Sequence, residues 1–138
     1  MLNLNWETPR FSPADVLGDP KLEHYTRLVP DRGDFGFVAE IDGRWVGVVW
    51  LLFLPEHDPG YGFVKPDVPE LSICVKPGYR GHGIGSRLVD KALAASRDRK
   101  LEAVTLSVEA GNRARDLYLR VGFGPVDGKT DDVLTVTL

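Results

Sequence analysis

Residues 70–90 read ELSICVKPGYRGHGIGSRLVD, and this stretch decides how the rest of the chain is arranged. Leu71, Ile73 and Val75 alternate with smaller or polar residues, which is the period-two pattern of a strand. Pro77-Gly78 ends that strand, because proline cannot donate to a ladder and glycine adopts turn dihedrals easily. The stretch therefore predicts a short strand, a glycine-rich turn and the start of an amphipathic helix.

Three glycines alternate in the turn, at Gly81, Gly83 and Gly85, where the helical pattern begins. The first N–H groups of a helix have no intrahelical partner and lie at the positive end of its dipole. A phosphate group accepts these bonds readily where no Cβ atom holds it away. Arg80 and Arg87 flank the turn and are placed to add charge-assisted contacts. The turn is a candidate pyrophosphate site; the alternative is a glycine-rich turn that binds nothing.

Two rival phosphate sites fit the turn poorly. A dinucleotide-binding fingerprint requires a glycine at the position of Ser86 and a purely parallel strand-helix-strand context. A P-loop requires a Gly-Lys-Ser/Thr ending, which this turn lacks. Both sites are therefore disfavoured.

Motifs on both sides of the turn indicate a family. A V-x-P-x-Y element precedes the turn, the turn contains R-x-x-G-x-G, and an N…LY…GF series follows. These motifs consist of Val75, Pro77, Tyr79, Arg80, Gly83, Gly85, Asn112, Leu117-Tyr118 and Gly122-Phe123. In this order and spacing they resemble the GNAT superfamily of acetyl-CoA-dependent N-acyltransferases. The resemblance extends from about Phe35 to the C-terminus.

The resemblance implies that acetyl-CoA is the co-substrate and assigns residues to it. The turn would hold the pyrophosphate, and Asn112 and the strand over residues 71–75 would hold the pantetheine arm. The assigned residues are Ile73, Cys74, Val75, Arg80, Gly81, His82, Gly83, Ile84, Gly85, Ser86, Asn112 and Tyr118. The resemblance also implies that this strand and the one over residues 104–108 splay apart, so that a free backbone N–H near Cys74 or Val75 binds the acetyl carbonyl.

Acetyl transfer to an amine needs a base, because an amine of pKa ~10.4 is almost wholly protonated at pH 7. The resemblance implies that Glu70 is this base; the alternative is a solvent-exposed glutamate at the strand end, and Glu109 is a second candidate. Tyr118 would protonate the departing thiolate, since a phenol of pKa ~10 keeps its proton at pH 7. The alternative is that Tyr118 only completes the apolar face of its helix.

Other reactive residues are not expected to take part. Cys74 reads as a small buried hydrophobe, and the backbone of His82 matters more than its ring. His24 and His57 have no partner at ligand spacing, so no metal site is expected. The function predicted is direct N-acetyl transfer in a ternary complex to an unidentified amine. A non-catalytic acyl-CoA-binding or regulatory module with the same fold is the alternative.

The composition of the chain limits the kinds of protein that it can be. The 138 residues, 43% hydrophobic and 27% charged, are expected to form one domain over residues 1–138. A formal charge of −3 disfavours a nucleic-acid partner. The single cysteine favours a reducing cytoplasm, and no apolar run reaches the ~20 residues that span a membrane. No secretory signal is expected, and the protein is expected to be a monomer or a homodimer.

The first half of the chain predicts helices and then a hairpin. Leu2–Trp6 suggests a weak strand, Ser12-Pro13 starts a short helix, and a second helical piece covers about residues 20–28. Strands follow over residues 35–41 and 45–54, joined by an Asp42-Gly43 turn. The irregular stretch over residues 55–69 carries Tyr61 and Phe63. It either borders an amine site, or its aromatic rings tuck into the core.

The second half alternates helices and strands. A helix runs from the glycine turn to about residue 100, and a strand covers residues 104–108. Asn112 caps a short helix that ends at Gly122, and a hairpin turns at Asp127-Gly128. The predicted order is αα-ββ-β-α-β-α-ββ. This is an α/β (mixed α+β) class: a twisted mixed sheet with helices on both faces.

Overall fold

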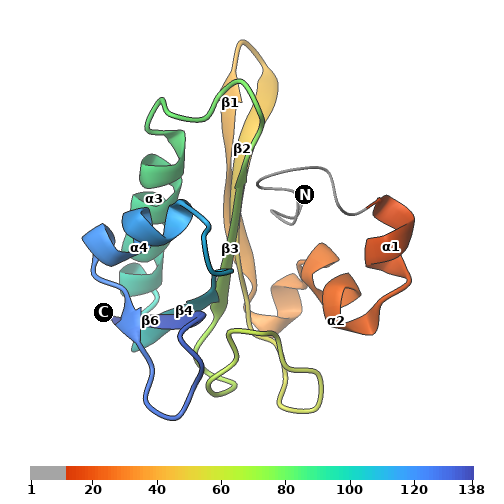
Figure 1. The fold of residues 1–138 in the computed structure, drawn as a ribbon, viewed down its shortest axis with the longest axis vertical. Helices are drawn as coiled ribbons and strands as arrows, with labels where there is room; N and C mark the ends of the chain where they lie inside the picture. The colour runs from red at the N-terminus through yellow and green to blue at the C-terminus, as the bar shows by residue number, and fades with distance from the viewer. Residues whose placement is uncertain (1–11) are drawn as a thin grey trace.

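The structure is a computed structural model that describes residues 12–138 (Figure 1). Six strands form one sheet in the order β1-β2-β3-β4-β6-β5. Helices α3 and α4 lie against one face of the sheet, and α1 and α2 lie beyond the other (Figure 1). The predicted mixed sheet with helices on both faces is confirmed. The weak strand predicted over Leu2–Trp6 lies outside the described residues.

The elements follow the predicted order. The strands are β1 (Phe35–Ile41), β2 (Arg44–Leu52), β3 (Glu70–Val75), β4 (Ala103–Ser107), β5 (Gly124–Pro125) and β6 (Val133–Thr137). The α-helices are α1 (Pro13–Leu17), α2 (Pro20–Glu23), α3 (Ile84–Asp98) and α4 (Ala114–Val121), and the 3-10 helices are η1 (His24–Thr26) and η2 (Pro30–Arg32). No helix in the described part of the chain is both long and apolar enough to cross a bilayer.

The first N-terminal helix is as short as the sequence predicts, whereas the second is shorter than predicted. Ser12 begins α1 with a capping box, in which its hydroxyl accepts from the Asp15 N–H and the Asp15 carboxylate accepts from the Ser12 N–H. The predicted helix over residues 20–28 is wrong in extent, because α2 ends at Glu23. The chain tightens there into η1, where Thr26 donates to the Glu23 carbonyl and Tyr25 is buried.

Strand β2 ends earlier than predicted, at Leu52. The N–H of Phe53 donates to the carboxylate of Asp34 (2.7 Å) and is therefore lost to the ladder. The hairpin turn before β2 behaves as its sequence predicts: Asp42 and Gly43 both have positive φ, 51° and 76°. Strand β4 covers residues 103–107, not the predicted 104–108, although the Val108 N–H still bonds the Asp132 carbonyl.

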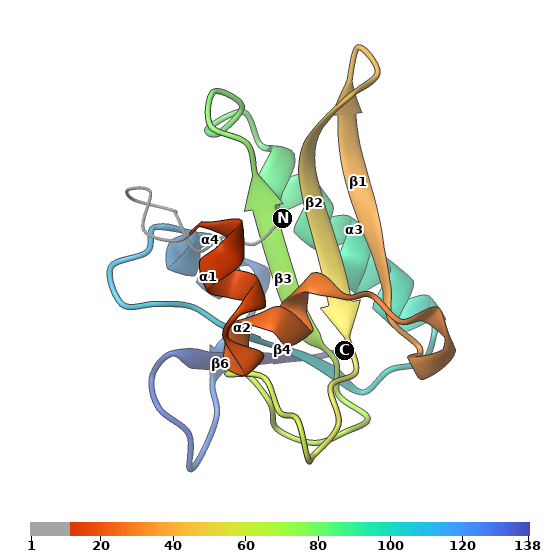
Figure 2. The same cartoon turned by 90° about the vertical axis from the view of Figure 1, so that its right-hand side faces the viewer.

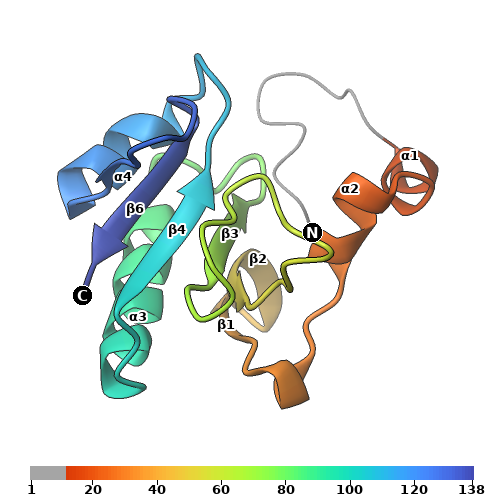
Figure 3. The same cartoon turned by 90° about the horizontal axis from the view of Figure 1, so that it is seen from below.

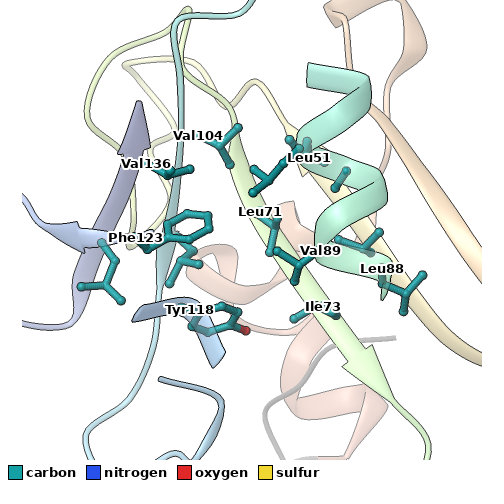
Figure 4. Close-up of a cluster of buried hydrophobic side chains, with 14 of the residues drawn as sticks. Leu51, Leu71, Ile73, Leu88, Val89, Val104, Tyr118, Phe123 and Val136 are labelled. Carbon is teal, nitrogen blue, oxygen red and sulfur yellow. The ribbon is translucent and has the colours of Figure 1, made fainter. Parts of the chain in front are cut away.

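The main core lies between the sheet and helices α3 and α4 (Figure 4). Leu51, Leu71 and Val104 contribute from the strands, and Val89 from α3. A smaller buried cluster on the opposite face consists of Tyr25, Trp50, Leu52 and Leu54. Strand β2 is thus buried on both faces for most of its length, as its nearly continuous apolar sequence predicts.

Candidate active site

Strands β3 and β4 are paired over a very short length. Among the described residues their parallel ladder consists of Glu70 opposite Thr105, next to a bond from the Thr105 N–H to the Pro69 carbonyl (3.0 Å). The other edge of β3 is paired with β2 from Glu70 to Val75. Figure 2 shows β3 and β4 running in clearly different directions. Beyond Glu70, β3 therefore has an edge that its neighbour does not use, as the family resemblance implies.

Figure 3 shows where this divergence lies. Seen from below, β4 and β6 run together with α4 beside them, while β3 stays with β1 and β2. The residues that the resemblance assigns to cofactor and chemistry come from β3, the start of α3, the β4–α4 connection and α4. The strand divergence and the candidate site thus coincide.

Tyr118 of α4 points toward β3. Its side chain is 5% exposed and packs edge to face with Phe123, with ring centroids 5.9 Å apart. Figure 4 shows its hydroxyl oxygen turned toward β3, near Ile73. Burial raises the pKa of the Tyr118 phenol, and the nearby Cys74 thiol adds to this effect. The Tyr118 ring is therefore part of the core, and its hydroxyl, which keeps its proton at neutral pH, is turned toward β3.

The glycine turn before α3 is open on its outer side. Gly78, Gly81 and Gly83 have φ of 90°, 81° and 80°, a region that side chains rarely adopt. A Cβ atom placed on any of them would meet nothing within 4 Å. Gly83 is the N-cap of α3, and no side chain caps the helix there. The first N–H groups of α3 thus lie at a part of the surface where no side chain of the turn glycines covers them.

Side chains around the turn hold it to its neighbours. Arg80 donates from Nε to the Val75 carbonyl (3.1 Å) and so ties the turn to the end of β3. His82 is exposed, and Ser86 is half-buried in the first turn of α3. Gly85 faces α4, where the nearest atom to its would-be Cβ is in Leu117, at 3.7 Å. Arg80 and His82 thus belong to the turn, and Gly85 and Ser86 to the first turn of α3.

Asn112 lies at the start of α4. Its side-chain oxygen accepts a hydrogen bond from the Ala114 N–H (3.0 Å), which is the predicted capping role. The helix itself begins at Ala114, one residue later than a cap at Asn112 implies. Glu109, the second candidate for the base, is exposed and lies in the connection after β4, not on the strand itself.

Glu70 is buried, with 4% of the residue exposed, so the alternative of a solvent-exposed strand end is wrong. Its Oε1 accepts from the Tyr25 hydroxyl (2.9 Å) and from the Gly62 N–H (2.8 Å). Burial raises the pKa of the Glu70 carboxyl, against the opposing effects of these two bonds and of the His24 charge. A carboxyl with a raised pKa in a buried position is a feature typical of functional sites.

Two glycines allow the 55–69 loop to close over Glu70. A Cβ atom on Gly62 would lie 2.8 Å from Glu70 Oε1. A Cβ atom on Gly60 would lie 2.7 Å from the Tyr25 hydroxyl and would collide with Glu70 Oε2. The Tyr61 N–H between them donates to the Tyr25 hydroxyl (2.6 Å). The backbone of the loop therefore packs directly against the Glu70 carboxylate, at positions where only glycine leaves enough room.

The aromatic residues of the loop have different positions. The Tyr61 ring is stacked on that of Tyr25, with centroids 6.3 Å apart and 12° between planes, yet Tyr61 is 56% exposed. Phe63 is half-buried. Tyr61 does not tuck into the core, whereas Phe63 is partly sheltered.

The sequence analysis missed a histidine–aspartate pair. His24 Nδ1 lies 2.9 Å from Asp58 Oδ1, and the imidazole packs edge to face against Tyr25, with centroids 4.5 Å apart. The two residues are 34 positions apart, so no spacing pattern indicates the contact. No group of three potential metal ligands occurs within residues 12–138.

The comparison with known families agrees with this geometry. The model of the acetyltransferase (GNAT) family matches residues 1–123, and the chain belongs to this family. The mycothiol acetyltransferase of Beutenbergia cavernae is 38% identical over 121 residues, which are 87% of this chain and 34% of that protein. The [ribosomal protein bS18]-alanine N-acetyltransferase of Haemophilus influenzae is 34% identical over 113 residues, 78% of this chain and 73% of that protein.

The fold also matches solved acetyltransferases. The PaiA N-acetyltransferase of Thermoplasma acidophilum, solved in complex with coenzyme A, superposes with a TM-score of 0.60 at 19% identity. The match covers 76% of this chain and 61% of that one. At this identity the likeness shows the fold alone. The chain spans only about a third of the mycothiol acetyltransferase and less than half of two further curated relatives.

Proposed function

We propose that this chain is an acetyl-CoA-dependent N-acetyltransferase that moves the acetyl group to a primary amine by direct transfer in a ternary complex. The observation that carries the proposal is the divergence of β3 from β4 beyond Glu70, beside the glycine turn, whose outer side is open. Family membership supports acetyl transfer, and the coenzyme A bound to a protein of the same fold supports the choice of co-substrate.

The residues around the opening fit acetyl-CoA. The uncapped N–H groups at the start of α3 suit a pyrophosphate, since the glycines leave no Cβ atom in the way. The unused edge of β3 suits the amide groups of a pantetheine arm, which bond to backbone as an added strand does. Asn112, just before α4, would contact the pantetheine arm as well as cap the helix. When bound, acetyl-CoA supplies the acetyl group as a thioester.

Glu70 is proposed as the base that takes the proton from the acceptor amine. Burial raises the pKa of its carboxyl in the direction of neutral pH. A general base is most effective when its pKa lies near the pH at which the enzyme works. Among residues 12–138, both side-chain hydrogen bonds of Glu70 go to Oε1. These bonds orient the group and leave Oε2 for the proton. Glu109 is exposed and has no such desolvated setting, so it is the weaker candidate.

Tyr118 is proposed to stabilise the sulfur that leaves. Its phenol keeps its proton at neutral pH, because burial raises its pKa. A phenol with a pKa above that of a thiol gives up its proton to a thiolate only partly, so its contribution is a strong hydrogen bond to the developing negative charge. Free backbone N–H groups on the edge of β3 would stabilise the oxyanion in the same way.

The acceptor class proposed first is the N-terminus of a protein. A relative that acetylates an alanine of a ribosomal protein is similar over most of its own length, 73%. A peptide beginning with alanine is therefore the first acceptor to test, followed by small amines such as amino acids, polyamines and drug-like amines.

Titration calorimetry with acetyl-CoA tests the co-substrate. The wild type is expected to bind with a Kd in the micromolar range, about −8 kcal/mol. Gly83→Glu is expected to abolish binding, because it adds bulk and negative charge in the turn. Gly128→Glu is the matched control: that glycine also has positive φ (78°) and open surroundings, but lies in the β5–β6 connection. Equal binding by both variants, or none by a folded wild type, would refute the site.

Turnover of the wild type and of Tyr118→Phe tests the reaction. A fall of about tenfold or more in kcat, with acetyl-CoA affinity unchanged, supports the role of the hydroxyl. Tight acetyl-CoA binding without turnover on any amine of a broad panel would instead indicate a non-catalytic acyl-CoA-binding module.

A further inference from the structure

His24 and Asp58 form an ionisable pair that the proposed mechanism does not use. The His24 side chain is 7% exposed, whereas that of Asp58 is 50% exposed. A carboxylate oxygen can only accept, so the Nδ1–H of the imidazole donates to Asp58 Oδ1 (2.9 Å). This bond fixes the orientation of the ring and the position of its Nδ1 proton.

Two buried polar atoms, one in this pair and one in Glu70, have no hydrogen-bond partner among the described residues. Among the buried side-chain nitrogen and oxygen atoms of residues 12–138, these are His24 Nε2 and Glu70 Oε2. Both side chains are held by the same short piece of the 55–69 loop. Asp58 bonds His24, and Gly60 and Gly62 lie against the Glu70 carboxylate. The loop therefore brings a histidine of η1 and a glutamate of β3 into one buried cluster.

The charges in this cluster act on one another. The ionisable groups that face Glu70 from its surroundings are His24 and Tyr25 on η1, with Tyr61 of the loop adjoining Tyr25. Tyr25 stays protonated because burial raises the pKa of its phenol. His24 is then the group in the cluster whose positive charge opposes the effect of burial on the Glu70 carboxyl.

We propose that the His24–Asp58 pair is a positioning device for Glu70: the imidazolium, held by Asp58, stabilises the ionised carboxylate that accepts the proton of the substrate amine. The proposal rests on the proposed role of Glu70 as the base. His24 is linked to Glu70 through Tyr25, whose ring it contacts edge to face and whose hydroxyl donates to Glu70 Oε1. It acts on how readily Glu70 loses and regains its proton.

A carboxyl ¹³C NMR titration of the protein without substrate tests the pair directly. The Glu70 signal is assigned by its loss in Glu70→Gln. In His24→Gln, the Glu70 carboxyl is expected to titrate at higher pH than in the wild type, because the opposing charge is gone. His57→Gln is the matched control, since His57 is next to Asp58 on the same loop but exposed. An unchanged Glu70 titration in His24→Gln would overturn the proposal.

The pH dependence of kcat/KM gives the functional measurement. On the acid limb His24→Gln is expected to lose roughly tenfold in kcat/KM, the scale on which neighbouring charges act on one another. At the alkaline end it should equal the wild type, because Glu70 is then ionised in both. A uniform loss at every pH would indicate a structural role only and would also overturn the proposal.

The experiments also distinguish a variant that does not fold from a failure of the proposed function. If His24→Gln does not fold, as judged by circular dichroism, the near-isosteric Asp58→Asn decides: it leaves the imidazole in place without its anion, and the Glu70 titration should still move to higher pH. If the wild type shows no acetyl transfer, the proposed function fails, while the NMR titration still decides whether His24 controls the ionisation of Glu70.

Discussion

Replacing Tyr25 by phenylalanine tests the structural basis of the site most directly. The substitution removes a hydroxyl that donates to Glu70 Oε1 (2.9 Å) and accepts from the Tyr61 N–H (2.6 Å). The ring remains, and with it the stacking on Tyr61 and the edge contact with His24. The change is therefore confined to two hydrogen bonds inside a buried cluster.

The expected cost follows from these two bonds. A bond to a carboxylate contributes roughly 1.5–3 kcal/mol, and a bond between neutral groups about 1 kcal/mol. Tyr25→Phe is therefore expected to lower the free energy of unfolding by about 3 kcal/mol, or the Tm by roughly 10 °C. The bond also lowers the pKa of Glu70, so its loss should raise that pKa further and move the acid limit of activity to higher pH.

Urea unfolding at pH 7 and a pH profile of kcat/KM measure these two effects. Tyr61→Phe is the matched control, because it also removes a phenol hydroxyl from the stacked pair but at a ring that is 56% exposed. It should change the free energy of unfolding by less than about 0.5 kcal/mol. A Tyr25→Phe protein as stable as this control, with an unshifted pH profile, would show that the Tyr25–Glu70 bond does not hold the site.

Three further predictions concern residues around this cluster. Glu70→Gln should be more stable than the wild type at neutral and alkaline pH in urea unfolding. The folded-state pKa of Glu70 is raised, so its contribution is lost as pH rises through that pKa, and the difference should vanish below the ordinary glutamate pKa of ~4.3. Gly60→Ala should cost about 2 kcal/mol, since its Cβ would lie 2.7 Å from the Tyr25 hydroxyl, whereas Gly124→Ala meets nothing within 4 Å and should be neutral by thermal unfolding. Asp34→Ala should cost roughly 3 kcal/mol by the same measurement, because the buried carboxylate binds Arg32 and accepts the N–H groups of Val29 and Phe53; near-wild-type stability of this variant would contradict that account.

The sequence predicts well what neighbouring residues encode. The capping serine of α1, the Asp42-Gly43 turn and the start of α3 after Gly83 appear as predicted, because each depends on a few consecutive residues. The GNAT resemblance adds the divergence of two strands, which no local pattern encodes. The order of elements therefore follows from the sequence, with errors mainly at the ends of elements.

The cluster around Glu70 was not predictable in the same way. Its bonds join residues 45 positions apart, Tyr25 and Glu70, and 34 positions apart, His24 and Asp58. Such contacts have no period in the sequence, and η1, which carries two of the residues, reads as the tail of an ordinary helix. One signal was present: glycines at alternate positions, 60 and 62, are typical of a backbone that approaches a buried group closely.

The arrangement around Glu70 favours its proposed chemistry over the stability of the fold. An apolar side chain or a glutamine at this position would avoid the desolvation that raises the carboxyl pKa. The chain instead surrounds the carboxyl with a tyrosine, a histidine and two glycines. The two bonds to Oε1 hold the group in place, while Oε2 is left without a partner among the described residues. A carboxyl that only stabilised the fold would be expected to use both oxygens. A carboxyl with one hydrogen-bonded oxygen and one without a partner is held in place and can still exchange a proton. The gain in the free energy of unfolding that is predicted for Glu70→Gln measures how much stability the buried glutamate costs the fold.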